Sequence, residues 1–384
     1  MRQFFQELKN FFRKGDLVLL LLLLITSAFG VIIISSATAW LGNVRYIIIQ
    51  VSAIVLGIFA YMIVSSIDAD FMSEHRLLLI AFNTLLILML VPFGTDNGSG
   101  NRSWLNFPFL PVDIQPAEIC KITFVVIMAS TLASHQTKVS SLRSVMHLCF
   151  QVGALAGLNF VISGDAGVSL IFVFMFIGIA FAGGVSLLWF ALAGGGLLAV
   201  WPIIWNVVMD EYQRKRIQVL YDPTIDPDGI DERYHAVRSL RSLTGGGWSG
   251  QGLYQGIRTQ NGELPAQRTD FIFSVIGEEL GFLGCIFVLA LEVAIIARCI
   301  YVGTKSPDYL RRMICFGAAS ALIFQVCSNV GMCLGVTPVI GLTLPFVSYG
   351  GSSIVTLFAM LGLVSGVHAR PSAPSHERYI RPFR

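Results

Sequence analysis

Long apolar stretches alternate with short polar segments along the whole chain. A membrane-spanning helix needs about 20 apolar residues, and ten stretches come close to that length. They run over about 17–38, 45–65, 76–93, 116–134, 146–163, 166–183, 186–207, 270–300, 312–334 and 347–368. Short turns near Gly164 and Gly183 leave nine or eleven open, and we predict ten. The pattern therefore predicts an all-α polytopic membrane protein with one large loop between its seventh and eighth helices.

Composition agrees with a membrane protein. Hydrophobic residues make up 55% of the 384 positions, charged residues make up 13%, and the mean hydropathy is +0.72. Soluble domains carry about a quarter charged residues, so lipid is the main solvent of this chain. The seven cysteines lie in or beside the apolar stretches without metal-ligand spacing, which predicts packing roles rather than zinc or haem binding.

Lysine and arginine residues in short loops indicate the orientation, because they concentrate on the cytoplasmic side. With ten spans and a cytoplasmic N-terminus, only Arg45 and Arg102 lie in short outside loops. The 15 inside residues are Arg2, Lys9, Arg13, Lys14, Arg76, Lys138, Arg143, Arg298, Lys305, Arg311, Arg312, Arg370, Arg378, Arg381 and Arg384. These flanks explain the net charge of +3, which therefore indicates no nucleic-acid partner. Both termini are predicted to be cytoplasmic, and the large loop extracytoplasmic.

This interpretation divides the chain into three parts. Residues 1–16 form a cytoplasmic segment whose apolar residues recur at helical spacing beside basic ones, as in a helix lying on the inner leaflet. Residues 17–370 form one membrane domain that includes the loop at 208–270, and residues 371–384 form a tail. The first apolar run is too long for the core of a cleavable signal peptide, so we expect no such peptide.

Polar residues inside apolar stretches are candidate site residues, because burying them in a bilayer is costly. Glu118 and Lys121 lie one helical turn apart in the fourth span, behind Gln115-Pro116. They form either a structural ion pair or a cation held near an anionic head group. Asp165, between the fifth and sixth spans, either caps the next helix or belongs to a site.

The large loop contains helical and glycine-rich segments. Residues 211–223 and 231–243 are predicted to form short helices along the outer surface. The basic run Arg214 to Arg216 is typical of solvent or lipid-phosphate contacts. The six glycines at 245, 246, 247, 250, 252 and 256 let backbone approach a ligand closely.

Acidic residues follow the loop. Asp270 lies at the outer water–lipid boundary, where desolvation raises a carboxyl pKa and the nearby Arg268 lowers it. A helix-capping role is the alternative for Asp270. Glu278 and Glu279 are expected to lie roughly 12 Å deeper, at about 1.5 Å per helical residue, with Lys121 as the available cation.

Two further polar groups lie near the C-terminus. Gln325 and Asn329 are one helical turn apart in the ninth span. Residues 348–353 open the tenth span, where free N–H groups suit a phosphate, although helix packing explains its glycines nearly as well. The glycine run within Ala193–Leu198 is most simply explained by close packing of the seventh helix.

Taken in this order, these polar groups resemble the SEDS family (shape, elongation, division and sporulation), the family of RodA- and FtsW-type proteins. The resemblance covers essentially the whole chain. It rests on TDFIFSVIGEELG at 269–281 and on the series Gln325, Asn329, Gly331, Pro338, Gly341 and LPFVSYGGSS. It also includes RSW and QPAEICK between 102 and 121, RKRIQVLYDP, and YHAVRSLRSLTGGGWSGQG.

The resemblance implies a peptidoglycan glycosyltransferase that polymerises lipid II at the outer face of the bacterial cytoplasmic membrane. Such an enzyme joins the acceptor 4-hydroxyl to the donor MurNAc C1 with inversion and releases undecaprenyl pyrophosphate. Asp270 matches the family's essential acidic residue and is expected to act as catalytic base. Substrate binding is expected from Arg102, Trp104, Glu118, Lys121, Gln325, Asn329, Ser348 and Gly350. A divalent cation, Mg²⁺ or Mn²⁺, is expected near the pyrophosphate with help from Asp165, and no organic cofactor.

The resemblance also implies a class B penicillin-binding protein as transpeptidase partner, within the elongation or division machinery. LPAQRTDFIF and the short tails favour the elongation (RodA) type over the division or sporulation types. Three departures weaken the match locally. Ala117 replaces a serine, the turn at 163–168 keeps only Asp165 and Gly167 of the family pattern, and two loop glutamines appear as His235 and Arg238.

Two other functions fit a ten-span protein. A lipid II flippase would also place polar residues at membrane depth, and a scaffold would only recruit the transpeptidase. An acidic residue at the outer boundary, rather than at the bilayer midplane, favours chemistry at the outer face over transport.

Overall fold

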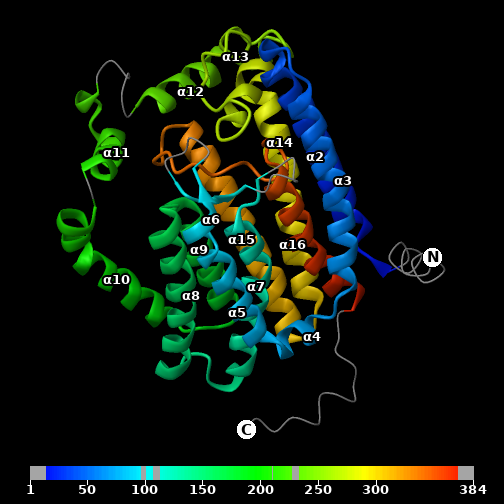
Figure 1. The fold of residues 1–384 in the computed structure, drawn as a ribbon, viewed down its shortest axis with the longest axis vertical. Coiled ribbons are helices and arrows are strands. Elements are labelled where there is room, and N and C mark those ends of the chain that lie inside the picture. The colour runs from blue at the N-terminus through cyan, green and yellow to red at the C-terminus, as the bar shows by residue number, and fades with distance from the viewer. Residues whose placement is uncertain (1–13, 97–100, 107–112, 210, 227–232, 371–384) are drawn as a thin grey trace.

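The structure, a computed structural model, describes residues 14–96, 101–106, 113–209, 211–226 and 233–370. It is built of helices and one small antiparallel sheet, in which Gly94–Thr95 (β1) pairs with Trp104–Leu105 (β2) (Figure 1). The helices are α2 (Leu17–Ala37), η1 (Ala39–Leu41), α3 (Arg45–Ser66), α4 (Ala69–Glu74), α5 (Arg76–Leu88), α6 (Leu90–Phe93), α7 (Pro116–Ser134), η2 (Gln136–Lys138), α8 (Leu142–Ser163), α9 (Ala166–Ala182), α10 (Leu187–Ile203), η3 (Ile204–Val208), α11 (Glu211–Tyr221), η4 (Pro223–Ile225), α12 (Tyr234–Gly245), α13 (Ile257–Gln260), α14 (Ile272–Lys305), α15 (Tyr309–Cys333) and α16 (Gly351–Ala369). The predicted interfacial segment and the tail lie almost wholly outside the described residues.

The predicted membrane spans are confirmed as apolar helices. Within the described residues, nine helical segments are long and apolar enough to cross a membrane. The apolar α9, with 17 residues, completes the predicted ten. Every boundary of these segments falls within five residues of the predicted one, although the eighth, Ile272–Lys305, includes a short piece before Gly281 that is not continuous with the rest.

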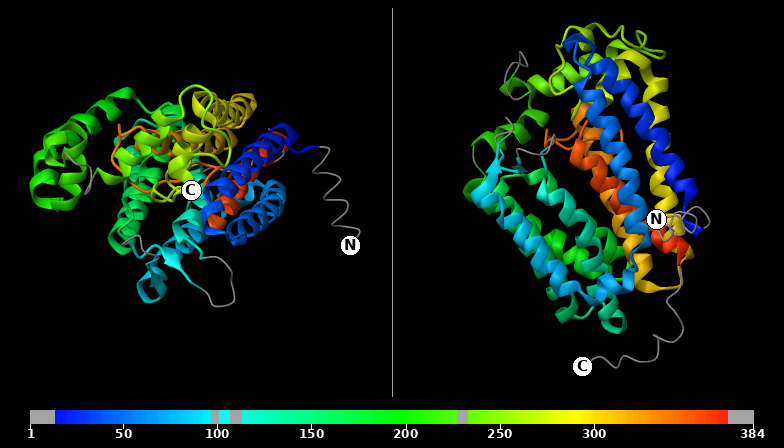
Figure 2. Two further views of the ribbon diagram at one scale, coloured as in Figure 1. Left: turned by 90° about the horizontal axis from the view of Figure 1, so that it is seen from above. Right: turned by 45° about the vertical axis from the view of Figure 1, so that its right-hand side comes forward.

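Small residues let the helices of the bundle approach closely. A Cβ atom on Gly362 of α16 would lie 2.7 Å from the carbonyl oxygen of Tyr61 in α3, and these two helices run side by side (Figure 2). Such contacts provide van der Waals packing between helices that lipid solvates equally well. The helices α7, α15 and α16 form the buried centre of the bundle.

Helix α10 departs from this packing. It stands at the side of the bundle (Figure 1), and none of its residues is buried. A Cβ atom placed on any of its three glycines, Gly194 to Gly196, would have no neighbouring atom within 4 Å among the described residues. The prediction that the run Ala193–Leu198 marks close helix packing is therefore wrong for this part of the chain.

The loop between α10 and α14 covers one end of the bundle, hereafter the loop end (Figure 1). Both short helices predicted there are present, as α11 and α12. The glycine-rich residues 245–252 lie directly on the backbone of α14: the N–H groups of Gln251 and Gly252 donate to the carbonyls of Glu278 and Glu279, both at 2.9 Å. We call this contact the glycine clasp.

Helix α14 consists of two pieces that meet at Gly281, whose φ of +66° and ψ of −162° are not helical. A Cβ on Gly284 would lie 3.2 Å from Cγ2 of Ile276, and one on Gly277 would lie 3.3 Å from Sγ of Cys285. Residues eight apart in a straight helix are about 12 Å apart. The short piece 272–280 therefore folds back beside the long piece 282–305.

The clasp holds this reversal in place. Beyond Gly281, the N–H groups of Phe282 and Leu283 donate to the carbonyls of Gly247 and Trp248, at 2.9 and 3.2 Å. Thus both the free carbonyls of the short piece and the free N–H groups of the long piece find partners in the loop, as buried helix ends require. The glycines predicted to approach a ligand approach α14 instead.

Candidate functional site

A polar pocket of about 480 Å³ lies beneath the loop at the loop end of the bundle. Segments far apart in sequence line it: the start of α7, the start of α9, α11, α12, the residues before α14, and the connection from α15 to α16. Its polar members include Trp104, Gln115, Glu118, Asp165, Arg216, His235, Thr269, Asp270, Gln325, Tyr349 and Ser353. Pockets with a few convergent polar groups and a perturbed carboxyl are the usual form of an active site.

The backbone around Asp270 is fixed by its neighbours. Asn329 Nδ2 donates to the carbonyl oxygens of Asp270 and Leu342, both at 2.7 Å. Ser348 Oγ donates to the carbonyl of Thr269 at 2.7 Å, and it accepts from the N–H of Leu344. These bonds tie the residues before α14 to α15 and to the connection ahead of α16, so the Asp270 side chain is held in the pocket.

The Asp270 carboxyl is partly exposed to the pocket and otherwise surrounded by protein. Burial, with a smaller contribution from the negative charge of Asp165, raises its pKa to about 6. Arg268, expected to lower that pKa, lies instead with its guanidinium 4.7 Å above the ring of Tyr46. A carboxyl with a pKa near 6 suits proton transfer near neutral pH.

Asp165 caps a helix, and its side chain also lines the pocket. Its Oδ1 accepts from the N–H of Val168 in the first turn of α9, at 3.0 Å. Its Oδ2 accepts from Gln115 Nε2 at 3.0 Å. Burial raises the pKa of Asp165 above its usual value.

Glu118 and Lys121 form the buried ion pair that their spacing predicts, at 2.8 Å. Glu118 also accepts from Thr356 Oγ1 at 3.0 Å and reaches the pocket, whereas Lys121 is 2% exposed and lies behind it. Because Lys121 is neutralised by its own helix, it does not serve Glu278 and Glu279, and that prediction is wrong.

Glu278 and Glu279 accept hydrogen bonds from the loop and from α2, and neither lines the pocket. Glu278 accepts from the N–H groups of Arg258 and Thr259, both at 3.0 Å, and from the Thr259 hydroxyl at 2.7 Å. Glu279 accepts from Ser36 Oγ, in the last turn of α2, at 2.7 Å. Since the short piece of α14 folds back, these carboxylates lie toward the loop end and not deeper than Asp270, contrary to the predicted 12 Å.

The structure separates the other predicted site residues into two groups. Trp104, Gln325 and Gly350 line the pocket with Asp270, Asp165 and Glu118. The Oε1 atom of Gln325 is buried and has no hydrogen-bond partner within the described residues. The pocket lining does not include Arg102, Lys121, Asn329 or Ser348; Arg102 is exposed, and the last two position the backbone instead.

Arg216 and His235 are pocket residues that sequence reasoning did not select. Arg216 of α11 donates to the carbonyl of Val339 at 3.2 Å and thereby reaches across from the loop. His235 of α12 stacks on Phe271 with ring centroids 5.8 Å apart, and burial followed by the charge of Arg216 lowers its pKa. Arg216 lies in a run of three basic residues, which gives no sign that one of them points inward.

Comparisons with known proteins agree on one family. A family model of the FtsW, RodA and SpoVE proteins, described as "Cell cycle protein", matches residues 16–372. Peptidoglycan glycosyltransferase MrdB of Escherichia coli (strain K12) is 30% identical over 365 residues, which cover 94% of this chain and 95% of the relative. A probable peptidoglycan glycosyltransferase FtsW of Geobacter metallireducens is 31% identical over 373 residues, covering 93% and 95%.

Solved structures give the same result. The chain is similar to one from a study titled "Structural coordination of polymerization and crosslinking by a peptidoglycan synthase complex", with a TM-score of 0.76, 28% identity, and coverage of 96% of this chain and 99% of the other. It is also similar to the rod shape determining protein RodA of Thermus thermophilus, with a TM-score of 0.68, 25% identity, and coverage of 96% and 98%.

Proposed function

Since this chain belongs to the SEDS family and is a peptidoglycan glycosyltransferase of the membrane, we propose that it polymerises lipid II in the pocket around Asp270. The observation that carries this proposal is the Asp270 carboxyl itself. Asn329 donates to the backbone carbonyl of Asp270, and Ser348 donates to that of the preceding Thr269. The carboxyl faces a polar pocket and has a pKa of about 6.

In the proposed reaction, Asp270 acts as general base. Its carboxylate accepts the proton of the acceptor 4-hydroxyl as that oxygen bonds to the donor C1 atom. The bond from C1 to the pyrophosphate oxygen breaks on the opposite face, so the centre inverts and undecaprenyl pyrophosphate leaves. A direct displacement of this kind needs one base and a stabilised leaving group.

Two features of the pocket support binding of the pyrophosphate. Arg216 brings a guanidinium, which pairs well with phosphate oxygens. Helix α16 begins at Gly351 without a side-chain cap, and Gly350 and Ser353 line the pocket, so its first N–H groups and its dipole favour a negative charge there. We assign to Arg216 the cationic role for which Arg102 and Lys121 are poorly placed.

We further propose a divalent cation at the pyrophosphate. The described residues contain no group of three or more histidine, cysteine, aspartate or glutamate side chains that would hold a metal by itself. Asp165 fits a site of the other kind, because Mg²⁺ often binds through one or two carboxylates and the substrate's phosphates. When bound there, the cation would neutralise the charge of the leaving pyrophosphate.

The setting proposed for this reaction follows from charge and from the relatives. The end of the bundle opposite the loop carries the arginines and lysines of the short connections, which supports a cytoplasmic location in a bacterium for this end and for both termini. The loop end would then face outward, where a class B penicillin-binding protein would crosslink the product. Elongation is the proposed setting, on the RodA-like LPAQRTDFIF segment.

The test is a polymerisation assay. The purified full chain, with a class B penicillin-binding protein, is incubated with labelled lipid II and Mg²⁺, and glycan products are separated by gel electrophoresis. Asp270→Asn is expected to abolish polymer while preserving the fold, and Arg216→Gln is expected to slow it more than Arg216→Lys. Polymer from Asp270→Asn at the parent rate would contradict the base role, and transbilayer movement of lipid II without polymer would indicate a flippase.

A further inference from the structure

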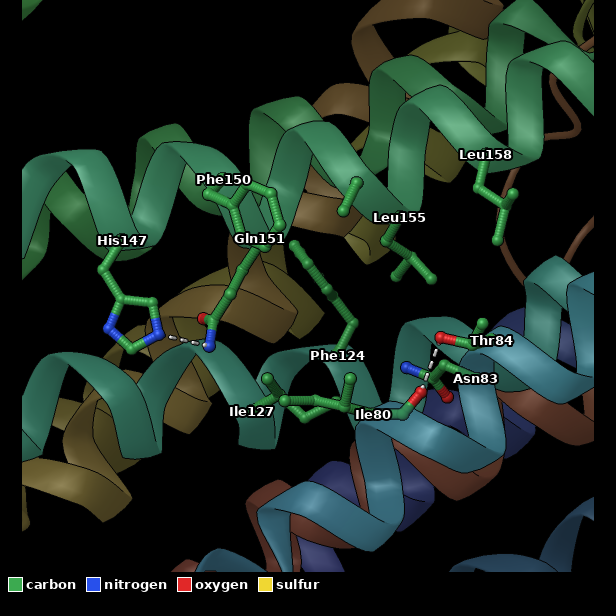
Figure 3. Close-up of a pocket in the computed structure, with 11 residues that line it drawn as sticks. Ile80, Asn83, Thr84, Phe124, Ile127, His147, Phe150, Gln151, Leu155 and Leu158 are labelled. Atoms are coloured by element: carbon green, nitrogen blue, oxygen red, sulfur yellow. Dashed lines mark hydrogen bonds between the residues drawn. The ribbon is translucent and has the colours of Figure 1, made fainter.

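A second cavity, of about 380 Å³, opens on the side of the bundle between α5, α7 and α8 (Figure 3). Its lining shares no residue with the pocket around Asp270. Apolar side chains form most of its walls, among them Ile80, Phe124, Ile127, Phe150 and Leu155. The volume lies within the range of about 300–1,000 Å³ that is usual for small-ligand sites.

The cavity faces lipid. The neighbouring apolar side chains on both flanking helices are exposed, including Leu77 and Leu78 on α5 and Met146 on α8. Helix α5 is held weakly by protein, since only Asn83 and Ile87 are buried along it. A hydrocarbon chain in the cavity would therefore join α5 to α8 where few side chains do so.

Two polar groups inside the cavity are unsatisfied. Asn83 is 1% exposed, and its Oδ1 accepts from Thr123 Oγ1, but its Nδ2 has no partner among the described residues. Gln151 Nε2 lies 3.3 Å from Nε2 of His147, as the dashed line in Figure 3 marks, while its buried Oε1 has no partner among those residues. Unpaired polar groups at membrane depth are costly, so they indicate a ligand with polar atoms.

The end of the cavity away from the loop is basic. Arg76 precedes Ile80 by four residues on α5, and Arg143 precedes His147 by four on α8, so each arginine lies one turn beyond a lining residue on the same helix face. His135 joins them, with its ring centroid 5.4 Å from that of His147.

Within the described part of the chain, no carboxylate forms an ion pair with a residue of this basic group. Burial, followed by electrostatic repulsion from the neighbouring His147, Arg76 and Arg143, lowers the pKa of His135, and none of the described residues raises it. Among the described residues, neither Arg76 nor Arg143 makes a hydrogen bond or an ion pair. The positive charge at this end of the groove is therefore available to an anion.

We propose that this groove binds an anionic phospholipid of the cytoplasmic leaflet, with one chain between α5, α7 and α8 and its phosphate at Arg76 and Arg143. Charge complementarity selects an anionic over a zwitterionic head group, because basic residues near a membrane surface attract anionic lipids. The buried amides of Asn83 and Gln151 would meet polar atoms of the glycerol ester region or of its bound water. The bound lipid would stabilise the packing of α5.

Native mass spectrometry of the full chain tests this proposal. The protein is purified in detergent and given phosphatidylglycerol, phosphatidylcholine or undecaprenyl phosphate, and retained lipid is counted per chain. We expect one retained phosphatidylglycerol. Since each basic residue contributes roughly fivefold to affinity for an anionic surface, Arg143→Gln should weaken retention about fivefold, and the double change with Arg76→Gln roughly twenty-fivefold.

Matched variants make the result decisive. Lys305→Gln removes an exposed basic residue elsewhere at the same end and should leave retention unchanged, and Arg143→Lys should keep most of it. Ala154→Trp, which fills the groove, should abolish retention of phosphatidylglycerol with the arginines intact. Equal retention of phosphatidylcholine, equal losses in Arg143→Gln and Lys305→Gln, or a preference for undecaprenyl phosphate would each overturn the proposal. Thermal unfolding of every variant without added lipid verifies its fold.

Discussion

The glycine clasp leaves no room for a side chain at Gly246, so we expect a substitution there to open it. Its φ of −83° is one that alanine adopts freely, so a substitution tests only the space available. A Cβ there would lie 1.9 Å from the carbonyl oxygen of Gly277, a backbone atom that cannot rotate away. To restore even the 3.0 Å lower limit of real Cβ contacts, the loop must withdraw by about 1.1 Å (3.0 − 1.9).

That withdrawal is large enough to break hydrogen bonds. The bonds from Gln251 N–H to Glu278 and from Gly252 N–H to Glu279 would lengthen from 2.9 Å to about 4 Å, beyond hydrogen-bond range. At about 1 kcal/mol each, two lost bonds cost about 2 kcal/mol, and all four bonds of the clasp would cost about 4 kcal/mol. We therefore expect Gly246→Ala to destabilise the clasp by about 2–4 kcal/mol.

Hydrogen exchange followed by mass spectrometry measures this opening directly. The amides of Phe282 and Leu283, within the peptide spanning 278–284, should exchange roughly thirtyfold to a thousandfold faster in Gly246→Ala, since about 1.4 kcal/mol corresponds to tenfold. Gly245→Ala is the control, because its nearest neighbour is the flexible end of Arg258 at 3.1 Å. If the two variants exchange alike at Phe282 and Leu283, the clasp does not hold the reversal, and the reasoning fails.

Three further outcomes are expected from the pocket and its ion pair. With an Asp270 pKa of about 6, its ionised fraction falls from about nine-tenths at pH 7 to about one-tenth at pH 5, so kcat/KM should fall about tenfold; a flat profile would exclude Asp270 as base. Asp165→Asn removes a negative charge that raises this pKa, so the acid limb of the profile should move to lower pH. Lys121→Met leaves the buried Glu118 unpaired and should lower the free energy of unfolding in detergent by about 3–5 kcal/mol. Adding Glu118→Gln should recover most of that loss. A double variant no more stable than Lys121→Met alone would contradict this.

The ten membrane helices follow from sequence because the bilayer imposes a single requirement on each. A segment must be apolar over about 20 residues and satisfy its own backbone, and only a helix does both. Local sequence also indicates the ends: Pro116 starts α7, Asp16 caps α2, and Asp165 caps α9. The pairing of Glu118 with Lys121 is equally local, since both lie on one helix.

The pocket depends on contacts that no local pattern contains. Asp270 is singled out by its family motif. What fixes its backbone is a pair of hydrogen bonds from distant residues: Asn329, 59 positions away, donates to Asp270, and Ser348, 79 positions away, donates to Thr269. Arg216 faces the pocket because α11 lies over the connection after α15, and the basic run alone does not distinguish it from its neighbours. Local patterns therefore nominate the candidates, and the tertiary contacts decide which of them face the substrate.

The reversal at Gly281 explains why the predictions for Glu278, Glu279 and Lys121 failed together. Counting 1.5 Å per residue from Asp270 assumes that the helix continues in one direction, and under that assumption Glu278 and Glu279 need a cation deep in the membrane. A single residue with φ of +66° turns the chain instead, and both carboxylates lie at the loop end, where each accepts hydrogen bonds from the loop or from α2. The backbone conformation of this one glycine therefore decides the depth of the acidic pair, whereas Lys121 pairs with Glu118 on its own helix.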